Sequence, residues 1–106
     1  MRKVRIAGVG FGPVAASHAS TFSERLKGLA APAALPALLI DTSSVHTFGM
    51  ATPIGVVGID EHNRVVAAKV VPPNRVVWLK GSRLILEVPE GGDLPGVGTR
   101  LRLEPE

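Results

Sequence analysis

The sequence is a succession of short apolar segments, each ended by turn residues within about a dozen positions. Ile54 to Asp60 and Arg64 to Val71 are rich in β-branched residues, and Arg83 to Pro89 has an apolar residue at every second position. Twelve Gly and nine Pro supply the many turns. Short strands with frequent turns are typical of β-sandwiches and compact barrels. We therefore predict a mainly β fold, a single compact domain over residues 1–106 built as a jelly-roll-like sandwich or barrel.

The same patterns predict individual strands. Val4 and Ile6 would face the interior from an edge strand. Gly10–Pro13 is predicted as a turn, and Glu61–Asn63 as the loop of a hairpin. The predicted strands are Lys3–Val9, Val14–Ser20, Ala37–Ile40, Ile54–Asp60, Arg64–Val71, Arg75–Leu79, Arg83–Pro89 and Thr99–Glu104.

One short helix is predicted near the N-terminus. Thr21 and Glu24 have the spacing of a capping box, in which each side chain accepts a hydrogen bond from the backbone N–H of the other residue. The helix would span Phe22–Lys27 and stop at Gly28. Arg25 has two interpretations: a solvated helix charge, or an anchor that ties the helix to a neighbouring strand.

Charge and composition exclude several classes of protein. Twelve Lys and Arg against nine Asp and Glu give a net charge of +3, but the basic residues are scattered along the chain. One Trp, three Phe and no Tyr offer few platforms for base stacking. We therefore predict no nucleic-acid partner. No apolar run approaches the ~18 residues of a transmembrane helix, so no membrane span is predicted. The absence of Cys excludes disulfides and a thiol nucleophile.

The first 20 residues loosely resemble a secretory signal peptide. They begin with basic residues, continue with an apolar stretch and end with small residues at Ala16–Ser20. Arg5 and Pro13 interrupt the apolar stretch, which favours a strand instead. We predict a cytoplasmic location, with export as the alternative.

Three separated blocks carry a family resemblance. The central block is Ser44–Met50, SVHTFGM; Ala19–Leu29 precedes it, and Leu86–Gly91, LEVPEG, follows it. Across about residues 4 to 103 the chain resembles the bacterial and archaeal domain-of-unknown-function family 192. The resemblance implies an all-β, jelly-roll-like domain with a small helix, and it implies no established activity.

The chain departs from the family pattern at three positions. Ala51 stands where the family usually has a basic residue, and Gly55 where it usually has Asp. The likeliest ion pair or ligand contact of the family motif is therefore missing here. Gly58 replaces a bulkier residue, and both glycines are predicted to weaken their strand by ~0.5–1 kcal/mol each.

No catalytic or metal constellation stands out. Ser44 and His46 would share a strand face, and Asp41 could approach them through the preceding turn. The opposing interpretation is that His46 packs its ring and bonds a backbone carbonyl. The three His residues lack metal-ligand spacing, so no metal and no cofactor are predicted.

The sequence favours a non-catalytic accessory or binding module for an unknown protein or small ligand, with no catalytic residues. A groove, if present, would be lined by Arg25, His46, Thr47, Met50 and Thr52. The alternative is a hydrolase-type enzyme centred on Ser44 and His46. A homodimer formed through edge strands is a further prediction.

Overall fold

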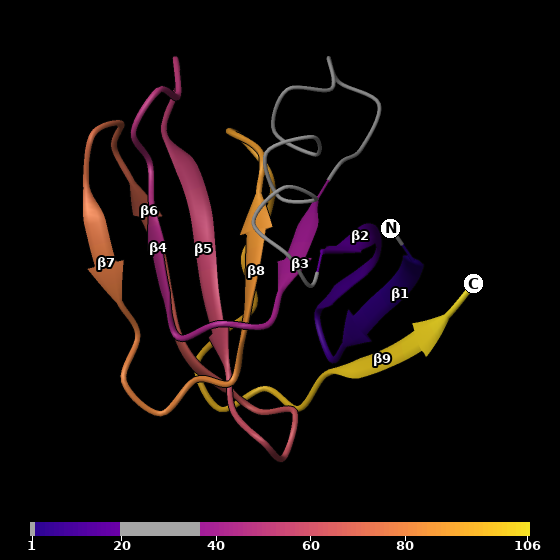
Figure 1. The fold of residues 1–106 in the computed structure, drawn as a ribbon. Helices are drawn as coiled ribbons and strands as arrows, with labels where there is room; N and C mark the ends of the chain where they lie inside the picture. The colour runs from indigo at the N-terminus through magenta and orange to yellow at the C-terminus, as the bar shows by residue number, and fades with distance from the viewer. Residues whose placement is uncertain (1, 20–36) are drawn as a thin grey trace.

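Nine strands in two sheets make up the fold of the computed structural model, which describes residues 2–19 and 37–106 (Figure 1). The larger sheet has seven strands in the order β6-β5-β8-β3-β2-β1-β9, and β4 and β7 pair as a separate antiparallel ribbon. Neighbouring strands are antiparallel except β2 and β3. The strands are β1 (Arg2–Gly8), β2 (Phe11–Ala19), β3 (Leu38–Ile40), β4 (Ser44–His46), β5 (Ile54–Ile59), β6 (Val65–Val71), β7 (Val76–Trp78), β8 (Leu84–Val88) and β9 (Arg102–Pro105).

The prediction of a mainly β fold is confirmed, but a closed barrel or jelly roll is not. The seven-stranded sheet is open, with β6 and β9 at its edges. Close to β6, the Leu101 N–H donates to the Asn63 carbonyl at 2.7 Å, so the chain leading into β9 crosses beside that edge. No helix occurs in residues 2–19 or 37–106. The helix predicted for Phe22–Lys27, including Arg25, lies outside the described residues, and the edge-strand homodimer stays a prediction.

The N-terminal hairpin corrects two predictions. β1 is not an edge strand, because it pairs with β2 on one side and β9 on the other. The turn predicted for Gly10–Pro13 is shorter, and β2 already begins at Phe11, which is buried. The inward positions of Val4 and Ile6 are confirmed, since both side chains are buried. The early start of β2 is explained by Phe11, whose side chain joins the core.

Both faces of the large sheet are covered, so its central strands are buried throughout. In β8, Leu84, Leu86 and Val88 belong to one core cluster, and Ile85 belongs to the other. The second cluster also contains Val45 from β4 and Val71 from β6, so the ribbon packs on that face of the sheet. Strands buried on both faces contain nearly continuous apolar runs, as β5 and β8 do.

The two glycines of β5 permit close packing. A Cβ at Gly58 would lie 3.0 Å from Leu79 Cδ1 and 3.1 Å from Ser82 Cβ. A Cβ at Gly55 would lie 2.6 Å from Leu94 Cδ2. The predicted weakening of the strand is therefore only part of the effect, because a larger residue at either position would have to displace its neighbours.

A larger residue at Gly58 should destabilise the protein. Gly58→Val would force its methyl groups against Leu79 and Ser82, and overpacking of this kind costs about 1–3 kcal/mol of unfolding free energy. Gly96→Val is the matched control, because a Cβ there would lie 3.7 Å from Thr99 Oγ1. Urea denaturation should show a loss for the first variant and little change for the second. Equal stability of the two variants would contradict the packing account.

The hairpin between β5 and β6 is closed by an acidic side chain. Asp60 Oδ1 accepts hydrogen bonds from the backbone N–H of His62 at 2.8 Å and of Arg64 at 2.9 Å. The hydrogen bond from Arg64 is the largest cause that lowers the pKa of Asp60 below its ordinary value, and the His62 bond adds to it, while desolvation acts in the opposite direction. The charged carboxylate thus favours the folded hairpin.

The contribution of Asp60 should depend on pH. Because its pKa is lower in the folded state, its stabilisation is present above the unfolded pKa and disappears as pH falls through the folded value. The stability difference between the wild type and Asp60→Asn should therefore shrink between about pH 7 and about pH 2. Urea titrations at several pH values measure this, with Glu61→Gln as the control. A difference that grows on acidification would refute the assignment.

Candidate functional site

Thr47, in the centre of the SVHTFGM block, holds the ribbon to the chain that follows β6. Its side chain is fully buried, with 0% exposure. Thr47 Oγ1 donates to the Pro72 carbonyl at 2.7 Å and accepts from the Arg75 N–H at 2.9 Å. The Thr47 carbonyl also accepts from the Asn74 N–H at 3.0 Å. Thr47 is therefore a structural residue, and its hydroxyl is not available to a ligand.

The other sequence-predicted site residues are dispersed. His46 is half-buried, and its ring stacks on Phe48 with a centroid distance of 5.2 Å and an interplanar angle of 27°. Met50 is half-buried against the second core cluster, whereas Thr52 is exposed. Arg25 lies outside the described residues. Of the four predicted residues that the structure describes, only His46, Thr47 and Met50, which belong to the SVHTFGM block, lie close together.

The arrangement around Ser44 gives no support to a catalytic triad. Asp41 Oδ2 lies 2.9 Å from His18 Nε2, so the carboxylate that the triad needs contacts a different histidine. The Thr42 hydroxyl accepts from the Ser44 N–H at 3.2 Å and donates to the Ser44 carbonyl at 3.0 Å. A nucleophile requires a base that is itself oriented by a third group, and the predicted Asp41 contact is not the one observed.

The outward side of the ribbon gathers exposed apolar side chains. Ser44 lies opposite Trp78, and His46 lies opposite Val76. Directly opposed residues of an antiparallel pair share one face, at a Cβ separation of about 5 Å. Trp78 is 72% exposed and Val76 49%, while Val77 between them packs inward. Together with Phe48, which is 56% exposed and stacks on His46, these residues form what we call the ribbon face: Ser44, His46, Phe48, Val76 and Trp78.

Basic residues flank the ribbon face. Arg75 and Lys80 are exposed at the two ends of β7. The sequence has no acidic residue between Asp41 and Asp60 or between Glu61 and Glu87. The segments that build the ribbon are therefore free of negative charge, and the ribbon face is an aromatic and apolar surface in a positive setting.

The ribbon face was not predicted from the sequence, because the number of aromatic residues does not show where they lie in the fold. A usable signal was present in Arg75 to Lys80, RVVWLK, where alternation sets Val76 and Trp78 on one side between two basic residues. The pattern alone does not show that this side faces solvent, which depends on Val77 entering the core.

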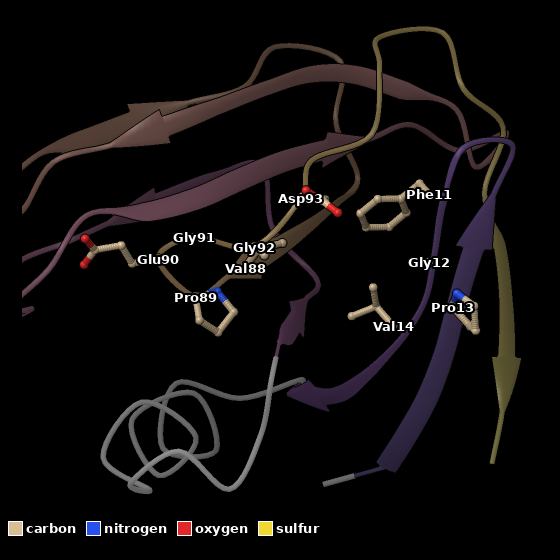
Figure 2. A pocket seen from close by; sticks show the side chains of 10 residues that line it. All are labelled: Phe11, Gly12, Pro13, Val14, Val88, Pro89, Glu90, Gly91, Gly92 and Asp93. Carbon is tan, nitrogen blue, oxygen red and sulfur yellow. The ribbon is translucent and has the colours of Figure 1, made fainter.

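A separate pocket, with a volume of about 660 Å³, lies beside the core cluster that contains Phe11 and Val88. Figure 2 shows the Phe11, Val14 and Asp93 side chains around this space, where the start of β2 meets the loop after β8. Glu90 and Asp93 are its charged residues. None of the sequence-predicted site residues lines it; the lining is Phe11, Gly12, Pro13, Val14, Val88, Pro89, Glu90, Gly91, Gly92 and Asp93.

The described part of the chain has neither a metal-binding cluster nor a helix that could span a membrane. Among residues 2–19 and 37–106, no three His, Asp or Glu side chains gather into a cluster that could hold a metal ion. Nor does any helix in these two ranges have the length and apolar character needed to cross a membrane.

The fold is shared with two solved structures of low sequence identity. One is a proposed transcription regulator from Sinorhizobium meliloti, with a TM-score of 0.72 and 16% identity over 96% of this chain and 92% of that one. The other is a protein of unknown function from Novosphingobium aromaticivorans, with a TM-score of 0.69 and 16% identity over 94% of this chain and 83% of that one. No protein-family model and no curated protein matches the sequence significantly. The resemblance to family 192 stays a prediction.

Removal of the Thr47 hydroxyl should destabilise the protein. Thr47→Val keeps the shape of the side chain but leaves the Arg75 N–H and the Pro72 carbonyl without this partner, and a lost buried hydrogen bond of this kind costs about 1–3 kcal/mol. Thr52→Val is the matched control, because Thr52 is exposed in the same segment. Urea denaturation should separate the two variants. If both lose the same stability, Thr47 does not have the structural role assigned to it.

Proposed function

We propose that the protein is a small non-catalytic binding module that docks an acidic partner protein on the ribbon face. The carrying observation is Trp78, the single Trp of the chain, whose side chain is 72% exposed. An aromatic residue that could have entered the core is instead held in solvent. Exposed apolar patches mark interaction sites, and Trp and Arg are enriched among the residues that dominate binding energy.

The ribbon is built to present this face without rearrangement. Val45 and Val77 anchor its inner side in the second core, and Thr47 ties its end to Pro72 and Arg75. A surface that is already ordered loses little conformational entropy on binding. The positive setting of the face selects the partner, because Arg75 and Lys80 attract acidic groups and repel basic ones.

Binding is better supported than the alternative of a hydrolase centred on Ser44 and His46. The Asp41 carboxylate contacts His18, and the Thr42 hydroxyl holds the main chain of Ser44. The mainly β fold also supports the proposal that the chain is a divergent member of family 192.

Site-directed photo-crosslinking tests the docking surface. Benzoylphenylalanine in place of Trp78 should form adducts with a small set of proteins in the cells that make this protein. The adducts should map by mass spectrometry to acidic segments of those proteins. The same group in place of Val9 is the control, because Val9 is 96% exposed and lies away from the ribbon in the β1–β2 turn. Adducts that are absent at position 78, or identical at both positions, would refute the proposal.

A further inference from the structure

The outer edge of β7 has main-chain hydrogen-bonding groups that point away from β4. The Thr47 N–H donates to the Arg75 carbonyl at 2.8 Å, and the Leu79 N–H donates to the Ser43 carbonyl at 2.9 Å. The Arg75 carbonyl and the Leu79 N–H therefore face β4. Because these groups alternate in direction along an antiparallel strand, the N–H and C=O of Val76 and Trp78 face outward.

No strand in the described ranges covers this outer edge, since β7 pairs with β4 alone. The outer edge of β4 is different. The Thr42 hydroxyl both accepts from the Ser44 N–H and donates to the Ser44 carbonyl, so a neighbouring side chain already satisfies that position. Figure 1 shows β7 at the outside of the molecule, with open space beyond it. The outer edge of β4 is therefore already satisfied at Ser44, whereas the outer edge of β7 can accept another strand.

Three features of β7 coincide on the same residues. Val76 and Trp78 supply the outward main-chain groups, and their side chains supply the exposed apolar surface. Arg75 and Lys80 add a positive charge at each end. An extended peptide can use all three features at once, with main-chain hydrogen bonds giving affinity and alternate side chains giving specificity.

We infer that the partner contributes an extended acidic segment that pairs antiparallel with the outer edge of β7. Its apolar residues lie on Val76 and Trp78. One of its acidic residues lies near Arg75 and another near Lys80. This inference rests on the proposed function and names its mode of recognition. A second copy of the chain does not fit, because two-fold pairing of β7 with itself would bring the same basic residues together. A nucleic acid would use the rings and the charges but not the main-chain groups.

The probe is the peptide acetyl-Glu-Thr-Val-Thr-Val-Glu-amide. In antiparallel register, its two Val residues lie opposite Trp78 and Val76, and its terminal Glu residues lie near Lys80 and Arg75. A second peptide carries N-methyl groups on the two Val residues, which removes the N–H groups that would bond to β7 and changes neither charge nor side chains. A third peptide replaces both Glu residues by Lys.

Titration of the isotope-labelled 106-residue chain should shift the amide NMR signals of Val76 and Trp78 most strongly, and Trp78 fluorescence should move to shorter wavelength. N-methylation should weaken binding about tenfold or more, because two hydrogen bonds are lost. Replacement of Glu by Lys should weaken it by a similar factor. Val76→Pro should also weaken binding, since it deletes an N–H that faces away from β4. Val97→Pro, at an exposed valine outside the ribbon, should leave binding unchanged.

Equal affinity of the N-methylated and parent peptides would overturn the inference, as would tighter binding of a short oligothymidylate than of the acidic peptide. Failure of the acidic peptide to bind would also overturn it. If Val76→Pro perturbs the ribbon, the comparison of the three peptides on the wild-type protein still shows whether the main chain of β7 binds the peptide. Crosslinks at Trp78 combined with failed peptide titrations would refute the strand pairing but not the proposed function. Absence of crosslinks would refute the proposed function.

Discussion

The buried hydroxyl of Thr47 ties the ribbon to the chain that follows β6. Thr47 Oγ1 joins the end of β4 to Pro72 and Arg75, residues about a quarter of the chain further along. These bonds fix where the chain turns after β6 and hence where β7 begins. Main-chain hydrogen bonds from the Thr47 N–H to the Arg75 carbonyl and from the Leu79 N–H to the Ser43 carbonyl hold the same ribbon, with Val77 packed against the second core. Thr47 thus helps to position the ribbon face, although it is not itself part of that face.

The large sheet explains why so small a chain can keep aromatic side chains outside. Its central strands bury apolar residues on both faces, and Val56, Val57, Ile85 and Leu86 are each 0% exposed. Apolar burial contributes roughly 25 cal/mol per Å², so aliphatic β-branched and Leu side chains supply the core without Trp. The Trp can then be retained on the surface at no cost to the interior.

Much of the fold was predictable from the sequence, but the site was not. The β5–β6 hairpin was predictable because its apolar periodicity and the turn at Asp60 are local features. The roles of Thr47 and Thr52 were not, since the burial of Thr47 depends on contacts with Pro72 and Arg75, which are distant in the sequence. From the local sequence Gly58 is predicted to weaken its strand, and only the approach of Leu79 shows that it permits close packing. The ribbon face required the pairing of β4 with β7, which no local pattern specifies.

The pairing of β1 with β9 has a consequence for folding. Val4 and Ile6 complete their strand neighbours only when Leu103 and Pro105, from a distant part of the chain, join the sheet. Contacts between such distant segments slow folding, because the entropy of closing a long loop must be overcome first. One edge of β1 therefore stays unpaired until β9 docks, so we expect closure of this edge to be a late step of folding.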